Sequence, residues 1–218
     1  MSGPGDRSIE LAGRTLGAPR HVCAFFNGLD EEHRVLRSFI KEGLEHGDKT
    51  IHIVESGLRD GHLKRLSDAG IDVARVLATA QLEVWSWDES YLREARFDQD
   101  RMLAQVGGAI ESSAAAGYPI TRFLGHMEWA LLDAPGVDDL LEYETRLNYV
   151  LRPYAHPVVC AYDLSKFGAQ VAIDAMRMHP MVILGGVLQE NPFFVPPDQF
   201  LLEIRERRST RKRTGAAS

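Results

Sequence analysis

Short runs of apolar residues alternate along the chain with longer segments in which apolar residues recur every three or four positions. The run His21-Val22-Cys23-Ala24-Phe25-Phe26 is typical of a buried strand. In the following segment, 30–46, apolar residues from Leu36 to Leu44 recur at helical spacing, and Gly47 suits a C-cap. The chain therefore opens with a strand, a turn and a helix.

The same alternation continues to the end of the chain. The predicted strands are 21–26, 50–55, 82–87, 120–126, 157–163 and 181–188, and the predicted helices are 30–46, 58–69, 72–79, 98–116, 137–151, 168–178 and 197–208. Strands rich in β-branched residues that alternate with helices predict a three-layer α/β domain, with a mostly parallel sheet flanked by helices. Alternation alone permits several strand orders in such a sheet.

The first turn, Asn27-Gly28-Leu29-Asp30, occupies the place where a phosphate-binding loop would lie. Such a loop needs backbone N–H groups freed by glycines, a lysine for the phosphates and a hydroxyl for the metal. This turn has one glycine, no Walker A lysine, and the acidic residues Asp30, Glu31 and Glu32 at the helix start, which would repel a triphosphate. The sequence thus predicts a nucleotide-binding architecture without the nucleotide chemistry, and favours binding or sensing.

Composition indicates one globular domain. The chain has 218 residues, 44% of them hydrophobic and 26% charged. No apolar run reaches the roughly 18 residues of a membrane helix, so we expect no membrane partner. Segment 1–19 lacks the apolar core of a secretory signal and is predicted to be disordered, ahead of a folded domain at 20–200 and a basic helix end and tail at 201–218. The presence of only two cysteines favours a reducing, cytoplasmic location.

The net charge of −6 hides an asymmetry. Residues 205–213 hold six bases and one acid, a balance of +5, so the remainder carries −11. An acidic body does not bind nucleic acid through a broad basic face. We therefore expect no direct nucleic-acid binding by the body of the domain, and interpret the basic tail as a solvated extension, with a contact to an acidic partner or to nucleic acid as the alternative.

Polar and aromatic residues follow the predicted strands, where parallel sheets bind ligands. They are Asn27, Asp30, Glu55, Ser56, Trp87, Asp88, Tyr91, His126, Glu128, Trp129, Tyr162, Asp163 and Lys166. This mixture suits a pocket for a small, partly apolar or cationic molecule. Structural roles stay open for single members, since Asp88 and Asp163 suit helix caps and Trp87 suits packing on a sheet.

The histidines and cysteines inside strands raise a second possibility. If their strands are neighbours, His21, Cys23, His52 and Cys160 can approach one another as a His₂Cys₂ metal set. Their spacing matches no metal-binding motif, and a buried free cysteine commonly serves as a small apolar residue. A thiol redox sensor is the other interpretation. We assign no metal and identify no cofactor from the sequence.

A set of short motifs resembles the MEDS domain, the methanogen/methylotroph sensory domain. The motifs are His21-Val-Cys23-Ala-Phe25-Phe26, Arg96-Phe97-Asp98, Met127-Glu128-Trp129, Glu142-Tyr143-Glu144 with Leu147-Asn148, Cys160-x-Tyr162-Asp163, His179-Pro180 and Asn191-Pro-Phe-Phe-Val-Pro-Pro197. Each motif is short, but their order and spacing together cover about 20–200.

The resemblance implies a RecA/KaiC-like fold without Walker A, and a non-enzymatic sensory module for small, hydrocarbon-derived organic ligands. It implies a signalling or transcription-regulatory protein as the partner, because such modules occur alone or joined to other signalling domains. The family positions are His21, Cys23, Glu128, Trp129, Tyr162, Asp163 and His179. Together with Glu55, Trp87 and His126 they form the predicted ligand-binding set. The sequence leaves open a homo-oligomer, and as the alternative function a divergent KaiC-like nucleotide-binding enzyme or a hydrolase that uses Glu128 or Asp163.

Overall fold

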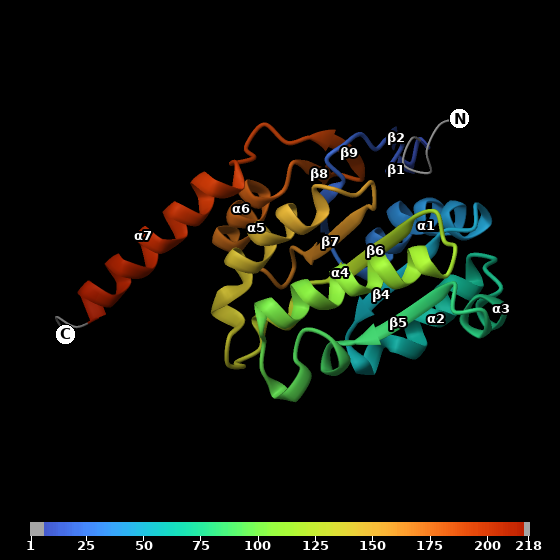
Figure 1. The fold of residues 1–218 in the computed structure, drawn as a ribbon, viewed down its shortest axis with the longest axis horizontal. Coiled ribbons are helices and arrows are strands. Elements are labelled where there is room, and N and C mark those ends of the chain that lie inside the picture. The colour runs from blue at the N-terminus through green and yellow to red at the C-terminus, as the bar shows by residue number, and fades with distance from the viewer. Residues whose placement is uncertain (1–6, 216–218) are drawn as a thin grey trace.

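A seven-stranded sheet with helices on both faces forms the centre of the molecule (Figure 1). The computed structural model describes residues 7–215. The strand order is β5-β4-β6-β7-β3-β8-β9, and all neighbouring pairs are parallel except β8–β9. The strands are β3 (His21–Phe26), β4 (Lys49–Val54), β5 (Leu82–Ser86), β6 (Thr121–His126), β7 (Val158–Asp163), β8 (Met181–Leu184) and β9 (Val187–Glu190).

Each strand divides its side chains between two apolar layers, because successive residues point to opposite faces of a sheet. Val22, Ala24 and Leu124 lie in one layer, under α1 (Leu29–Glu45), α2 (Arg59–Asp68) and α3 (Val73–Ala78), and we call this side the α1 face. Cys23 and Tyr162 lie in the other layer, under α4 (Gln99–Ala115), α5 (Leu140–Leu151) and α6 (Ala169–Met178), which we call the α5 face. The predicted three-layer, mostly parallel architecture is confirmed.

Local signals start the helices where the sequence predicts them. The Asp98 side chain accepts a hydrogen bond from the Arg101 N–H at 3.0 Å and caps α4, while Asp72 caps α3 in the same way. Gly28 precedes α1 with φ 93°, a conformation that favours glycine. Short 3₁₀ helices occupy several connections: η2 (Ser56–Leu58), η3 (Trp87–Glu89), η4 (Arg93–Ala95), η5 (Glu128–Leu131) and η6 (Val137–Asp139).

The prediction of a single strand at 181–188 is wrong, because this segment forms a β-hairpin. Gly185 and Gly186 adopt φ of 57° and 76° and turn the chain between β8 and the antiparallel β9. Two consecutive positive φ angles make the tight turn that a Gly-Gly pair favours. The hairpin therefore places β9 as the outermost strand at one edge of the sheet.

The N-terminal segment is more ordered than predicted. Strands β1 (Glu10–Leu11) and β2 (Arg14–Thr15) pair with each other, and Ile9, Leu11 and Leu16 are buried in the apolar layer of the α1 face. Burial of these side chains offsets the entropy lost on ordering the segment. Residues 1–6 of the predicted disordered segment lie outside the described residues.

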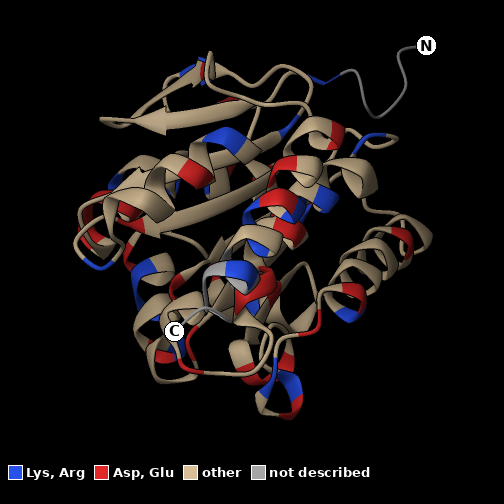
Figure 2. Ribbon diagram, turned by 90° about the vertical axis from the view of Figure 1, so that its left-hand side faces the viewer, with Lys and Arg blue, Asp and Glu red and all other residues tan. Residues whose placement is uncertain are grey.

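The C-terminal helix α7 (Pro197–Gly215) extends beyond the predicted 197–208. Phe200 and Ile204 anchor its first half in the core, and the second half projects away from the body (Figure 1). Acidic and basic residues are interspersed over the ribbons in Figure 2, and Arg208 bonds to Glu142 and Asp139, so part of the basic tail is paired. Within residues 7–215, no helix combines the length and apolar character needed to cross a membrane.

Candidate functional site

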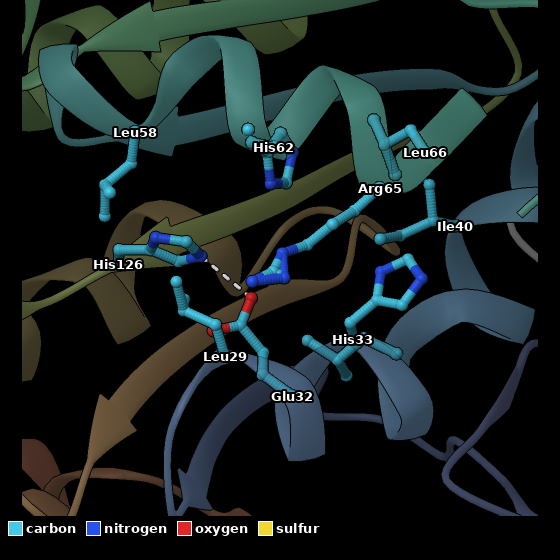
Figure 3. A pocket seen from close by; sticks show the side chains of 11 residues that line it. Leu29, Glu32, His33, Ile40, Leu58, His62, Arg65, Leu66 and His126 are labelled. Atoms are coloured by element: carbon cyan, nitrogen blue, oxygen red, sulfur yellow. Dashed lines mark hydrogen bonds and ion pairs between the residues drawn. The ribbon is translucent and has the colours of Figure 1, made fainter. Parts of the chain in front are cut away.

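A cavity of about 90 Å³ lies between α1 and α2 on the α1 face, beside the carboxyl end of β6 (Figure 3). His126, the last residue of β6, forms its floor together with Glu32 from the first turn of α1. His62 and Arg65 reach it from α2. The complete lining is Leu29, Glu32, His33, Leu36, Ile40, Leu58, Gly61, His62, Arg65, Leu66 and His126.

Glu32 and His126 form a buried ion pair at this floor. Glu32 Oε1 lies 2.8 Å from His126 Nε2. Burial alone would lower the pKa of His126, but the carboxylate outweighs it and raises that pKa. Burial would likewise raise the pKa of Glu32, and the imidazolium outweighs it and lowers that pKa. The pair presents a positive and a negative group at neighbouring points of one small cavity.

A second pair of histidines is held without charge next to this ion pair. His52 Nδ1 lies 2.8 Å from His62 Nε2, so one imidazole donates and the other accepts. Burial, followed by repulsion from the neighbouring imidazoles, lowers the pKa of His62 to about 4 and that of His52 well below its usual value. Neutral imidazoles keep both a donor and an acceptor available near the cavity.

Apolar side chains make up the rest of the wall. Leu29, Leu36, Ile40, Leu58 and Leu66 surround the polar floor. The volume of about 90 Å³ is smaller than the roughly 150 Å³ of an engineered cavity that holds benzene, and it suits a molecule of about four non-hydrogen atoms. An apolar enclosure with a few polar groups is the usual form of a small-molecule site.

The turn before α1 does not offer a phosphate cradle. The Asn27 N–H donates to Glu31 Oε2 at 2.7 Å, and the Asn27 amide nitrogen lies 3.2 Å from the same oxygen. The chain's own carboxylate thus takes the backbone donor that an incoming phosphate would need. This contact supports the prediction of a nucleotide-type architecture without nucleotide chemistry.

Of the predicted ligand-binding residues, His126 lines the cavity, Glu128 follows β6 in η5, and Asp163 is the last residue of the neighbouring strand β7. Burial raises the pKa of Glu128, although His126 acts to lower it, and Lys166 Nζ lies 4.0 Å from the carboxylate. Asp163 Oδ1 accepts hydrogen bonds from the Ser165 N–H at 3.0 Å and the Ser165 hydroxyl at 2.6 Å. Asp163 therefore organises a turn.

The predicted tryptophans and Glu55 lie elsewhere. Trp129 is fully buried on the α5 face, where it stacks on Tyr91 at 4.6 Å between ring centroids and packs against Phe97. Trp87 belongs to the same apolar layer. Glu55 is exposed at the start of η2. The packing interpretation of Trp87 therefore holds, and Trp129 also packs in the core rather than in the cavity.

The remaining predicted residues, His21, Cys23, Tyr162 and His179, are buried on the α5 face and do not reach the cavity. His21 and His179 meet Cys160 and Glu144 in a compact cluster there. The four residues His21, Cys23, His52 and Cys160, considered above as a possible metal set, do not come together, because His52 points to the α1 face and contacts His62. The predicted single pocket is thus divided between the two faces of the sheet.

Sequence reasoning missed Glu32, His62 and Arg65 as cavity residues. In the sequence Glu32 is one of three acidic residues in a first helical turn, and the helix dipole is a sufficient reason for an acid at that position. His62 and Arg65 lie on α2 with no motif around them. Only the packing of α2 against α1 reveals their role.

Comparison with known proteins identifies the family to which this sequence is similar. The profile of MEDS, the "MEthanogen/methylotroph, DcmR Sensory domain", matches residues 20–180. The transcriptional repressor DcmR of Methylorubrum extorquens is 24% identical over 172 residues, which cover 78% of this chain. The chain spans 62% of the length of that repressor.

The fold has relatives among solved structures. The crystal structure of a KaiC-like protein from Pyrococcus horikoshii superimposes with a TM-score of 0.53 at 15% identity, covering 75% of this chain and 70% of that one. This likeness concerns the fold, and it confirms the predicted RecA/KaiC-like architecture. With the profile covering most of its length, the chain belongs to the MEDS family of sensory domains.

Proposed function

We propose that this domain senses a small, hydrocarbon-derived organic molecule in the cavity between α1 and α2, and that binding regulates a partner protein in transcriptional control. The observation that carries the proposal is the cavity itself, with its apolar wall and its buried Glu32–His126 pair. Membership of a sensory family and the similarity to a transcriptional repressor support it.

The cavity sets the chemistry of the ligand. Its size suits about four non-hydrogen atoms, and a short alcohol, ketone or amine places an alkyl group against Leu36, Ile40 and Leu66. The polar end then meets Glu32 and His126. A polar end that hydrogen-bonds to this pair fixes the orientation of the ligand, so both ends contribute to selectivity.

The position of the cavity gives the ligand a way to change the surface of the domain. Its walls come from two separate helices, and α1 follows the interior strand β3 after a short turn. A ligand stabilises the spacing of α1 and α2 that fits it best, by the difference in its affinity for the two spacings. The outer surfaces of α1 and α2 are therefore the proposed readout for a protein partner.

The test is amide NMR of the full chain titrated with ethanol, acetone and methylamine. We expect at least one probe to shift amides of α1, α2 and the end of β6 in a saturable manner. Leu58→Phe, which adds bulk at the cavity wall, should remove the response. The matched control is Leu77→Phe on α3, a half-buried leucine outside the cavity, which should keep it.

Two results would overturn the proposal. One is a set of responses that survives Leu58→Phe, because the probes then bind elsewhere. The other is the absence of any response to the probes together with saturable shifts on addition of ATP and Mg²⁺ at the Asn27–Asp30 turn. That result would support the alternative function, a nucleotide-binding enzyme. Loss of ATP hydrolysis in Glu128→Gln would then assign the reaction to Glu128.

A further inference from the structure

A second polar cluster lies on the α5 face, inside the apolar core and separate from the cavity. His21 Nε2, Glu144 Oε2, Cys160 Sγ and His179 Nε2 lie within 4.8 Å of one another, and all of these side chains are buried. They come from β3, α5, β7 and the end of α6. Nitrogen, oxygen and sulfur donors thus converge from separate elements on one point.

The hydrogen bonds behind the cluster fix which ring nitrogens face it. The Asn148 amide nitrogen faces the carbonyls of Glu144, Thr145 and Met178, so its Oδ1 must face His21 Nδ1, at 3.1 Å. His21 Nδ1 is therefore the donor. His179 Nδ1 donates to the Ala175 carbonyl at 2.7 Å. Both Nε2 atoms then direct lone pairs toward the centre of the cluster.

With these ring orientations, the cluster has more acceptor lone pairs than hydrogen atoms to bond them. The single thiol hydrogen of Cys160 faces Glu144 Oε2 at 3.3 Å and His21 Nε2 at 3.6 Å. Among the described residues, Glu144 Oε1 and His179 Nε2 make no hydrogen bond, although His179 Nε2 lies 3.1 Å from Glu144 Oε2, acceptor against acceptor. Buried polar atoms are nearly always paired, and such orphaned acceptors around one point indicate a cation.

We propose that His21, Glu144, Cys160 and His179 bind one Zn²⁺ ion as a closed, four-coordinate structural site. Tetrahedral zinc with bonds of about 2.0–2.3 Å separates its ligand atoms by about 3.3–3.6 Å. The separations here are 3.3 Å from His21 to Glu144, 3.6 Å from His21 to Cys160, 3.3 Å from Cys160 to Glu144 and 3.1 Å from His179 to Glu144. These are four of the six separations in the set, and the other two, from His179 to His21 and to Cys160, lie within 4.8 Å, so a small inward shift of His179 completes the tetrahedron.

Charge and donor type agree with zinc. On binding, the Cys160 thiol releases its proton to solvent, and the thiolate and the Glu144 carboxylate then balance the two charges of the ion. A neutral site is what a buried position in an apolar core requires. A mixed set of imidazole, thiolate and carboxylate in tetrahedral array is a zinc set, and the Asn148 and Ala175 contacts orient its histidines.

An entry route lies at the amino end of β3. A cavity of about 440 Å³ there has His21 and Asn148 in its wall, together with Arg20 and Tyr149. An ion that enters this cavity reaches the cluster when the His21 ring swings aside. The inference is independent of the sensory proposal, because the two sites lie on opposite faces of the sheet.

The test uses the untagged full chain, stripped with EDTA and titrated with Zn²⁺ and then with Co²⁺ as a spectroscopic probe. We expect one zinc per chain by elemental analysis, a rise in melting temperature with zinc concentration, and the visible and thiolate charge-transfer bands of tetrahedral cobalt. Cys160→Ala should lose the charge-transfer band.

The matched control is Cys23→Ala, at the register partner of Cys160 on β3. The chain has two cysteines, so a charge-transfer band that persists in Cys23→Ala comes from Cys160 even if Cys160→Ala fails to fold. His52→Gln on the α1 face should also keep its zinc. The proposal is overturned by a wild-type chain that binds well below one equivalent, or by a cobalt site without a thiolate band in Cys23→Ala.

Discussion

His62 makes the fold sensitive to acid, and the size of this effect follows from its surroundings. The imidazole is neutral in the folded state because burial lowers its pKa from 6.5 to about 4. In the unfolded chain the pKa returns to about 6.5. Charged or titratable groups surround it on every neighbouring element: His52 on β4 and His126 on β6 contact the ring, and Glu32 and His33 on α1 and Arg65 on α2 act on it electrostatically.

The sign follows from proton binding. Between pH 6.5 and about 4 the unfolded state binds a proton at His62 that the folded state excludes. The free energy of unfolding therefore decreases as the pH is lowered through this window, by about 1.4 kcal/mol per pH unit for this one group. Over the whole window, the pKa difference from 6.5 to about 4 amounts to about 3 kcal/mol.

The substitution that isolates this contribution is His62→Gln. Glutamine keeps an amide that can hydrogen-bond to His52 but does not titrate. We expect the stability curve of the variant, from urea denaturation at intervals between pH 7 and 4.5, to be shallower than wild type by about 1.4 kcal/mol per pH unit. NMR titration of the His62 ring should give a midpoint near 4. Parallel curves for the two proteins, or a midpoint near 6.5, would refute the reasoning.

Three further predictions concern the core. Asp48→Asn removes the carboxylate 2.8 Å from the buried Arg122 guanidinium and leaves it only the more distant Glu42 at 3.9 Å, which should cost about 3–5 kcal/mol in urea denaturation. Gly43→Ala would place a Cβ 2.6 Å from Arg122 Nε and should destabilise the fold by about 1–3 kcal/mol. At Gly107 on α4 an added Cβ has no atom within 4 Å, so Gly107→Ala should stabilise the fold by up to about 1 kcal/mol. Equal effects of the two glycine substitutions would contradict the packing at Arg122. Trp129→Ala removes a fully buried ring and should lower the melting temperature with a loss of about 3–5 kcal/mol, and a loss below about 1 kcal/mol would place that ring outside the core.

The fold was largely predictable because its signals are local. Apolar runs and helical spacing identified β3 to β7 and the helices between them, and the caps Asp72 and Asp98 lie where α3 and α4 begin. The hairpin at Gly185-Gly186 was missed, although the glycine pair was its signal. The packing of Leu11 and Leu16 was missed because an isolated apolar residue gives no periodicity to detect.

The site was predictable only in part, because its residues depend on sheet faces and on helix packing. His21 and Cys160 were grouped correctly, since both lie on strands that turn out to be neighbours. His52 was grouped wrongly, because a strand alternates its faces and the sequence does not show which face α2 covers. The meeting of Glu32 with His126 required the strand order, which alternation leaves open.

The measurement that tests the sensory account most directly is a crystal structure of the chain soaked with 2-bromoethanol, located by the anomalous scattering of bromine. This probe has four non-hydrogen atoms, an apolar end and a hydroxyl. We predict the bromine among Leu36, Ile40 and Leu66, with the hydroxyl against the Glu32–His126 pair. Bromine found only outside this cavity would contradict the account.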